Sequence, residues 1–82
     1  MPGFHFRIVD RDGIFSTEQA YQFENADAAC RHAKTVLAEM ALDGLPGEPV
    51  NAYSVQVLDA QRHAIYEVRL KVEIIPSLAK AD

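Results

Sequence analysis

Apolar and polar residues alternate along residues 4–8, and this period of two is typical of a strand with one buried face. The apolar positions are Phe4, Phe6 and Ile8. Residues 10–13 read Asp-Arg-Asp-Gly and predict a tight turn, because glycine tolerates positive φ and aspartate can accept a bond from the backbone that follows it. Apolar residues resume on both sides of a polar stretch at 16–20. We therefore expect a returning strand that is bent or interrupted.

The spacing of apolar residues changes to three and four in the next segment, which predicts one amphipathic helix over about 25–43. Its apolar positions are Ala26, Ala29, Cys30, Ala33, Val36, Leu37, Met40 and Ala41. Asn25 can accept a first-turn backbone N–H as the N-cap, while Gly44 and Pro46 stand where the helix has to end. The many alanines predict that the first half of the helix packs close to a sheet.

Two further strands are expected after a loop over 45–51 that is rich in Pro and Gly. Residues 53–57 and 64–74 alternate again, and the turn between them at 59–62 has no glycine. The last strand has the clearest pattern of the chain, with Ala64, Tyr66, Val68, Leu70, Val72 and Ile74 on one face and Glu67, Arg69, Lys71 and Glu73 on the other. Pro76 ends it.

These elements predict an α+β fold, a two-layer open sandwich in the order β-β-α-β-β. A four-stranded, mainly antiparallel sheet carries the one helix on one face. We expect a single domain over 1–76 and a flexible C-terminal tail over 77–82. The strand order stays open. A right-handed helical crossover makes the second and third strands parallel neighbours, and direct pairing of the first and fourth strands is the alternative.

Charge and cysteine content narrow the class of protein. Eight Lys and Arg against twelve Asp and Glu give a net charge of -4, which argues against general binding to nucleic acid or to an anionic membrane. Cys30 is the only cysteine, so no intrachain disulfide forms, and inside a helical pattern we expect a buried, inert thiol. The chain has neither a signal-like start nor a long apolar run. We therefore expect a cytoplasmic protein that does not associate with membranes.

No constellation of residues predicts catalysis or metal binding. His5, His32, His63 and Cys30 are the only soft metal ligands. Cys30 and His32 are two residues apart on a helix and point in different directions, and no Cys-x-x-Cys or His-x-x-x-His spacing is present. The serines have no nucleophile motif, and no glycine-rich phosphate loop is present. We expect no enzyme activity, no cofactor, and no catalytic, cofactor-binding or metal residues.

The outward face of the sheet is the candidate interaction surface. Its residues are His5, Arg7 and Val9 on the first strand and Ile65, Arg69 and Lys71 on the last. If the two strands were neighbours, their cationic residues would form a basic stripe. We favour the simpler interpretation that Glu67 and Glu73 neutralise it through cross-strand pairs. Val9 and Ile65 add apolar surface, and a long last strand at a sheet edge could pair with another chain.

Several short motifs, spread over nearly the whole chain, occur in an order and spacing that can be compared with a known family. They are Met1-Pro2-Gly3-Phe4-His5-Phe6, Asp12-Gly13, Phe23-Glu24-Asn25-Ala26-Asp27-Ala28-Ala29, Leu37-Ala38-Glu39-Met40, Asp59 and Val68-Arg69-Leu70. With them the chain resembles a family of short bacterial proteins classed as a domain of unknown function. The resemblance implies the same architecture and a bacterial origin, and it brings no catalytic residues. The chain departs from the family pattern at 17–20 and at Arg62, which stands where a turn glycine is usual.

The function expected from the sequence is a non-enzymatic protein-interaction module that binds a protein partner or self-associates as a homodimer. One alternative is a nucleic-acid-associated regulator that uses the outer sheet face. A second alternative is a small ligand-binding domain or enzyme.

Overall fold

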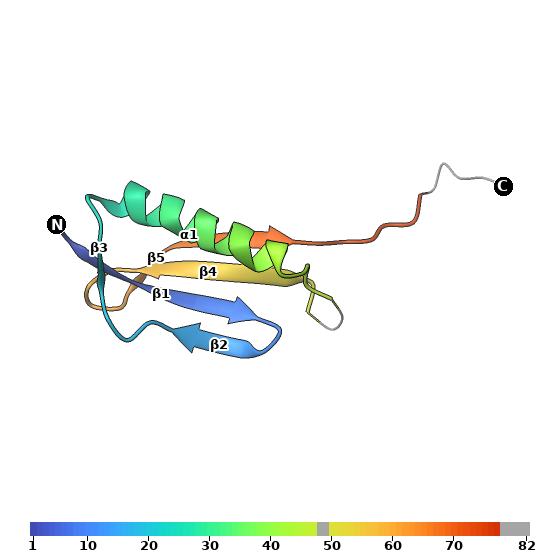
Figure 1. Ribbon diagram of the computed structural model, residues 1–82, viewed down its shortest axis with the longest axis horizontal. Helices are drawn as coiled ribbons and strands as arrows, with labels where there is room; N and C mark the ends of the chain where they lie inside the picture. Colours follow the sequence, from blue (N-terminus) through green and yellow to red (C-terminus); the bar gives the residue numbers. More distant parts are fainter. Residues whose placement is uncertain (48–49, 78–82) are drawn as a thin grey trace.

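The computed structural model describes residues 1–47 and 50–77 and has one helix lying along one face of a sheet (Figure 1). The elements are β1 (Gly3–Asp10), β2 (Gly13–Ser16), β3 (Tyr21–Gln22), α1 (Ala26–Leu42), β4 (Ala52–Leu58) and β5 (Ala64–Lys71). This is the expected α+β sandwich, with a fifth strand because the returning strand is split into β2 and β3. Residues 48–49 of the expected loop and 78–82 of the expected tail lie outside the described residues.

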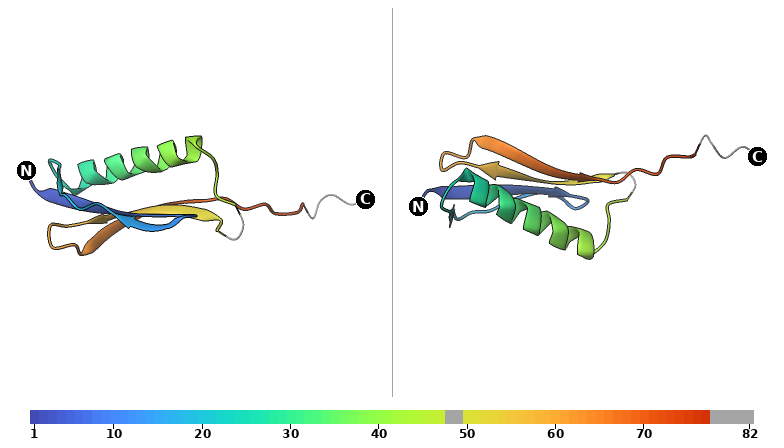
Figure 2. Two further views of the ribbon diagram at one scale, coloured as in Figure 1. Left: turned by 60° about the horizontal axis from the view of Figure 1, so that its bottom comes forward. Right: turned by 90° about the horizontal axis from the view of Figure 1, so that it is seen from above.

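The sheet has the order β2-β1-β4-β5, every pairing is antiparallel, and β3 pairs with the beginning of β1. Neither strand order considered from the sequence is observed, because β1 lies beside β4. In this register Phe6 faces Val57 and Ile8 faces Val55. The order places the two strands with the most buried inner faces at the centre of the sheet, where one helix can cover them (Figure 2).

The core lies between α1 and the central strands. The helix begins after Asn25, whose side-chain Oδ1 accepts a hydrogen bond from the Ala28 N–H at 2.9 Å, as the sequence predicted. Ala29 and Ala33 are completely buried, which agrees with a close approach of the helix to the sheet. The buried cluster consists of Phe4, Phe6, Ala29, Ala33, Leu37, Tyr53, Val55 and Val57. The expectation of a buried Cys30 is wrong: the thiol residue is half-exposed at the border of the buried stripe.

Two departures from the expected strands have simple causes. β5 ends at Lys71 instead of residue 74, because β4 begins at Ala52, which is the register partner of Lys71. On the outer face, His5 is only 8% exposed and its partner Leu58 is buried as well. Both lie near the point where the β4–β5 turn is tied to residues 17–18, so this end of the outer face is shielded from solvent.

Aspartate side chains accept backbone hydrogen bonds in both hairpin turns, and the sequence predicted this chemistry for the first turn. Asp10 Oδ1 accepts a bond from the Asp12 N–H at 2.8 Å, and Gly13 takes a φ of 124°. In the second turn, Asp59 Oδ1 accepts from the N–H groups of Gln61 and His63, both at 2.9 Å. Aspartate side chains therefore organise both turns.

Arg62 occupies the left-handed conformation that usually takes glycine, with a φ of 66°. Its guanidinium Nη1 and Nη2 donate to the backbone carbonyls of Thr17 and Glu18 at 3.3 and 3.1 Å. These bonds join the β4–β5 turn to the segment that follows β2. They offset the cost of left-handed backbone at a residue with a Cβ, which is about 1–2 kcal/mol.

Two substitutions at Arg62 distinguish the contribution of its two side-chain hydrogen bonds from the cost of its left-handed backbone. We expect Arg62→Ala to lower the free energy of unfolding by about 1 kcal/mol, because the two bonds are lost and the strain remains. Arg62→Gly loses the same bonds but relieves the strain, so its stability should lie within about 0.5 kcal/mol of the original. Urea unfolding followed by circular dichroism measures both. Equal losses in the two variants would contradict the account of this turn.

Candidate protein-interaction edge

The outer edge of β5 is an open edge of the sheet. β5 stands last in the strand order, and no described strand pairs with its far side. The Val72 N–H donates to the Asn51 carbonyl at 2.8 Å, which fixes the alternation of bonds along this antiparallel pair. From Tyr66 onward, the even-numbered residues of β5 therefore bond to β4, and residues 67, 69 and 71 point their N–H and C=O groups away from the sheet. The register shifts between Val57 and Leu58, at the beginning of β5, so this alternation does not extend to Ile65.

An apolar groove runs along the inner side of this edge, between α1 and β5. It has a volume of about 260 Å³ and is lined by Lys34, Leu37, Ala38, Ala41, Val68, Arg69 and Leu70. Val68 and Leu70 are half-buried, and Tyr66 on the same face is 46% exposed. One helix about 10 Å wide cannot cover four strands spaced about 4.8 Å apart, so the inner face of β5 stays partly uncovered.

The outer face of β5 carries charges that pair along the strand. Arg69 donates from Nε and Nη2 to Glu67 Oε2, at 2.9 and 2.6 Å. Lys71 Nζ lies 3.9 Å from Glu73 Oε1. Both pairs are exposed, so each contributes little to stability. The order of these charges along β5 affects which charges a strand added at the edge can carry opposite them.

The surface expected from the sequence divides into two parts. Ile65, Arg69 and Lys71 all lie on β5, whereas the other three residues, His5, Arg7 and Val9, lie on β1 with β4 in between. The neighbour of Arg7 is Gln56 of β4, whose Oε1 accepts from Arg7 Nη1 at 3.0 Å. The structure thus brings half of the residues to the edge and leaves the others two strands away.

The groove residues were missed from the sequence. Leu37, Val68 and Leu70 read as ordinary core positions, because the local pattern gives the face of a residue but not the distance to the sheet edge. The ratio of one helix to four strands was the available signal, since it requires uncovered apolar surface at an edge.

The opposite edge is less suited to pairing. β2 has only four residues, and its large side chains Ile14 and Phe15 are exposed on opposite faces. A short edge strand offers few backbone groups to a partner. β5 is twice as long and has the groove beside it.

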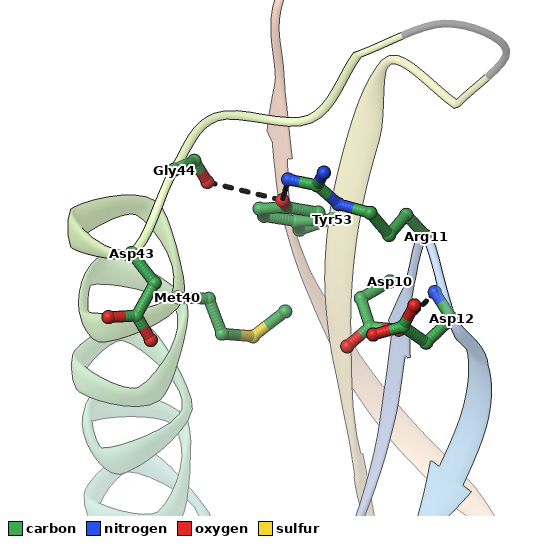
Figure 3. Close-up of a pocket in the computed structure, with 7 residues that line it drawn as sticks. All are labelled: Asp10, Arg11, Asp12, Met40, Asp43, Gly44 and Tyr53. Atoms are coloured by element: carbon green, nitrogen blue, oxygen red, sulfur yellow. Dashed lines mark hydrogen bonds between the residues drawn. The ribbon is translucent and has the colours of Figure 1, made fainter.

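A second pocket, of about 210 Å³, lies between the first hairpin and the end of α1 (Figure 3). It is lined by Asp10, Arg11, Asp12, Met40, Asp43, Gly44 and Tyr53. Arg11 Nη2 donates to the Tyr53 hydroxyl at 3.2 Å, and this hydroxyl donates to the Gly44 carbonyl at 3.1 Å. The bond from Arg11 to Tyr53 raises the pKa of Arg11 above its ordinary value, so the guanidinium stays charged.

This polar network has a structural use. The last turn of α1 contains no basic residue, and Arg11 supplies a positive charge near its negative end. Tyr53 links that charge to the carbonyl that follows the helix. The hydrogen bonds of Arg11 and Tyr53 therefore hold the first hairpin turn against the end of the helix.

Removing the Tyr53 hydroxyl tests this link. We expect Tyr53→Phe to lower the free energy of unfolding by about 1 kcal/mol, because two bonds around a buried hydroxyl are lost. Tyr21→Phe is the matched control, since Tyr21 is half-exposed and its ring is retained. Its unfolding midpoint in urea should stay unchanged. A Tyr53→Phe variant as stable as the control would show that the two hydrogen bonds of the Tyr53 hydroxyl do not contribute to the stability of the fold.

Two negative findings apply to the described part of the chain. Residues 1–47 and 50–77 contain no cluster of three or more His, Cys, Asp or Glu side chains able to hold a metal ion. Within the same ranges, no helix combines the length and the apolar character needed to cross a membrane.

The fold and the edge define a small two-layer α+β domain whose sheet has one long open strand beside an apolar groove. The chain belongs to the family DUF6894, a domain of unknown function, whose model matches residues 3–71. The match runs from the first residue of β1 to the last residue of β5. The comparisons with curated proteins and with solved structures gave no match.

Proposed function

We propose that this domain is a non-enzymatic protein-interaction module of the cytoplasm that binds a protein partner through the β5 edge. The observation that carries the proposal is the open β5 edge beside an apolar groove. An added strand would bond to the free N–H and C=O groups, and the groove would take the side chains on one face of that strand. The single half-exposed thiol suits a reducing compartment.

The two alternatives have less support. A basic stripe for nucleic acid would need the cations of β1 and β5 to be adjacent, but β4 separates them and Glu67 pairs with Arg69. For a ligand-binding domain or enzyme, the pocket beside Tyr53 would be the candidate site. Its polar groups already bond to one another across the helix end.

Site-specific photocrosslinking in native cells tests the proposal. A photoreactive amino acid replaces Lys71, an exposed residue whose backbone faces the β5 edge, and in the control it replaces Arg31, an exposed residue of α1. We expect one discrete protein adduct from position 71 and none from position 31, with the adduct identified by mass spectrometry. The absence of an adduct at position 71, or the same adducts from both positions, would overturn the proposal.

A further inference from the structure

We propose that the partner at the β5 edge is a second copy of this chain, paired antiparallel through β5 about a two-fold axis at Val68. The inference rests on the proposed function and names the partner of that surface. It predicts a continuous eight-stranded sheet made of β2-β1-β4-β5 from both copies, with both helices on one face. The register follows from backbone parity, charge and the shape of the inner face.

Backbone parity restricts the register. In the regular part of β5, residues 67, 69 and 71 present bonding groups at the edge, so each must lie opposite an odd-numbered residue of the other copy. With the axis at Val68, Glu67 lies opposite the partner's Arg69, and Ile65 lies opposite the partner's Lys71. The pair of Glu67 with Arg69 and its symmetry mate form about four backbone hydrogen bonds.

Charge selects this register from those that parity allows. With the axis at Val68, each Glu67 faces an Arg69 and no like charges are opposed. Moving the axis to position 67 or to position 69 sets two identical charges directly opposite each other. An axis at Leu70 places Arg69 opposite the partner's Lys71, and an axis at Tyr66 leaves both Glu67 side chains opposite isoleucines.

The inner face supports the same register. Tyr66 lies opposite the partner's Leu70, which lines the groove beside α1. The ring of Tyr66, 46% exposed in the single chain, would cover the groove of the other copy. Val68 would face its own copy at the axis. The apolar surface that one helix leaves uncovered is thereby shared between two chains.

Charge reversal and mixing test the inference. We expect the unmodified chain to form dimers at micromolar concentration in sedimentation equilibrium. Glu67→Arg and Arg69→Glu should each weaken self-association about 100-fold, because two attractive pairs become two repulsive ones. An equimolar mixture of the two variants restores opposite charges at every pair, and it should associate as tightly as the original chain.

Two controls accompany the mixing experiment. The double variant Glu67→Arg/Arg69→Glu should recover the homodimer, since the complementary charges are exchanged in both copies. Arg31→Glu reverses a charge on the exposed side of α1 and should leave the dissociation constant unchanged. Circular dichroism checks that every variant remains folded.

A disulfide tests the position of the axis. Residues at the axis form a non-hydrogen-bonded pair with Cα atoms about 4.5 Å apart, a separation that a disulfide can bridge. In a Cys30→Ala background, Val68→Cys should therefore crosslink under mild oxidation. Lys71→Cys should not, because six strand residues separate the two copies of position 71 by roughly 20 Å.

The outcomes separate this inference from the proposed function. A chain that stays monomeric at micromolar concentration, or variants that do not associate on mixing, would overturn the homodimer. In that case, a photocrosslinked adduct of position 71 with a different protein would still support the proposed function as an interaction module. Crosslinking through position 71 instead of position 68 would overturn the register.

Discussion

Replacing Phe6 with alanine is expected to lower the free energy of unfolding by about 3–5 kcal/mol, the cost of removing a buried aromatic side chain. Phe6 is 3% exposed, and its ring centroid lies 5.9 Å from that of Phe23, 6.0 Å from that of Tyr21 and 5.3 Å from that of His32. The ring joins β1, β3 and the first half of α1. A cavity at this place removes contacts from all three elements.

The matched control is Phe15→Ala, on the neighbouring strand. Phe15 is 63% exposed, so its loss should cost less than about 1 kcal/mol. Both values come from urea unfolding at a concentration where the chain is monomeric. A domain of this size has a total stability of roughly 4–12 kcal/mol, so Phe6→Ala should remove at least about a quarter of it. Similar losses in the two variants would contradict the assignment of the buried face.

The second large effect is expected at Leu37, in the middle of α1. Leu37 is 7% exposed and packs in the buried cluster between the helix and the central strands. We expect Leu37→Ala to lower the free energy of unfolding by about 2–4 kcal/mol, because the substitution leaves a cavity under the helix. Alanine is itself a good helix former, so the loss reports packing and not helix propensity.

Leu42→Ala, in the same helix, provides the control for Leu37→Ala. Leu42 is 86% exposed, and its replacement should change the stability by less than about 0.5 kcal/mol. Thermal unfolding followed by circular dichroism resolves the difference. A control variant that loses as much stability as Leu37→Ala would mean that the opposite face of the helix packs on the sheet.

The sequence predicts the local structure of this domain well because the signals are local. Alternation identifies β1, β4 and β5, and the polar stretch at 16–20 correctly indicates an interrupted strand. The side chain of Asn25 caps α1, and that of Asp10 organises the first turn, as expected from chemistry within a few residues.

The neighbours of each strand could not be predicted in the same way. Alternation specifies which face of a strand is buried and is silent about which strand lies beside it. The pairing of β1 with β4 therefore had to come from the structure, and with it the separation of Arg7 from Arg69. The burial of His5 was missed for the same reason, since Leu58 lies beside it through a long-range pairing.

The candidate site depends on this long-range information as well. The sequence indicated that a long last strand at an edge could pair with another chain, and the strand order places β5 at the edge. Ile65, Arg69 and Lys71 were identified from their outward positions. The groove along α1 was not identified from the sequence, because it results from one helix covering four strands and not from any short motif.

The central claim is that β5 pairs with another strand through residues 67, 69 and 71. Amide hydrogen exchange followed by nuclear magnetic resonance at increasing protein concentration tests it most directly. The N–H groups of Tyr66 and Val68 bond to β4 and should be protected at every concentration. Those of Glu67 and Arg69 should exchange rapidly in dilute solution and become protected as the concentration rises. Exchange at Glu67 and Arg69 that stays rapid at all concentrations, or protection that arises at Ile14 of β2 instead, would contradict the account.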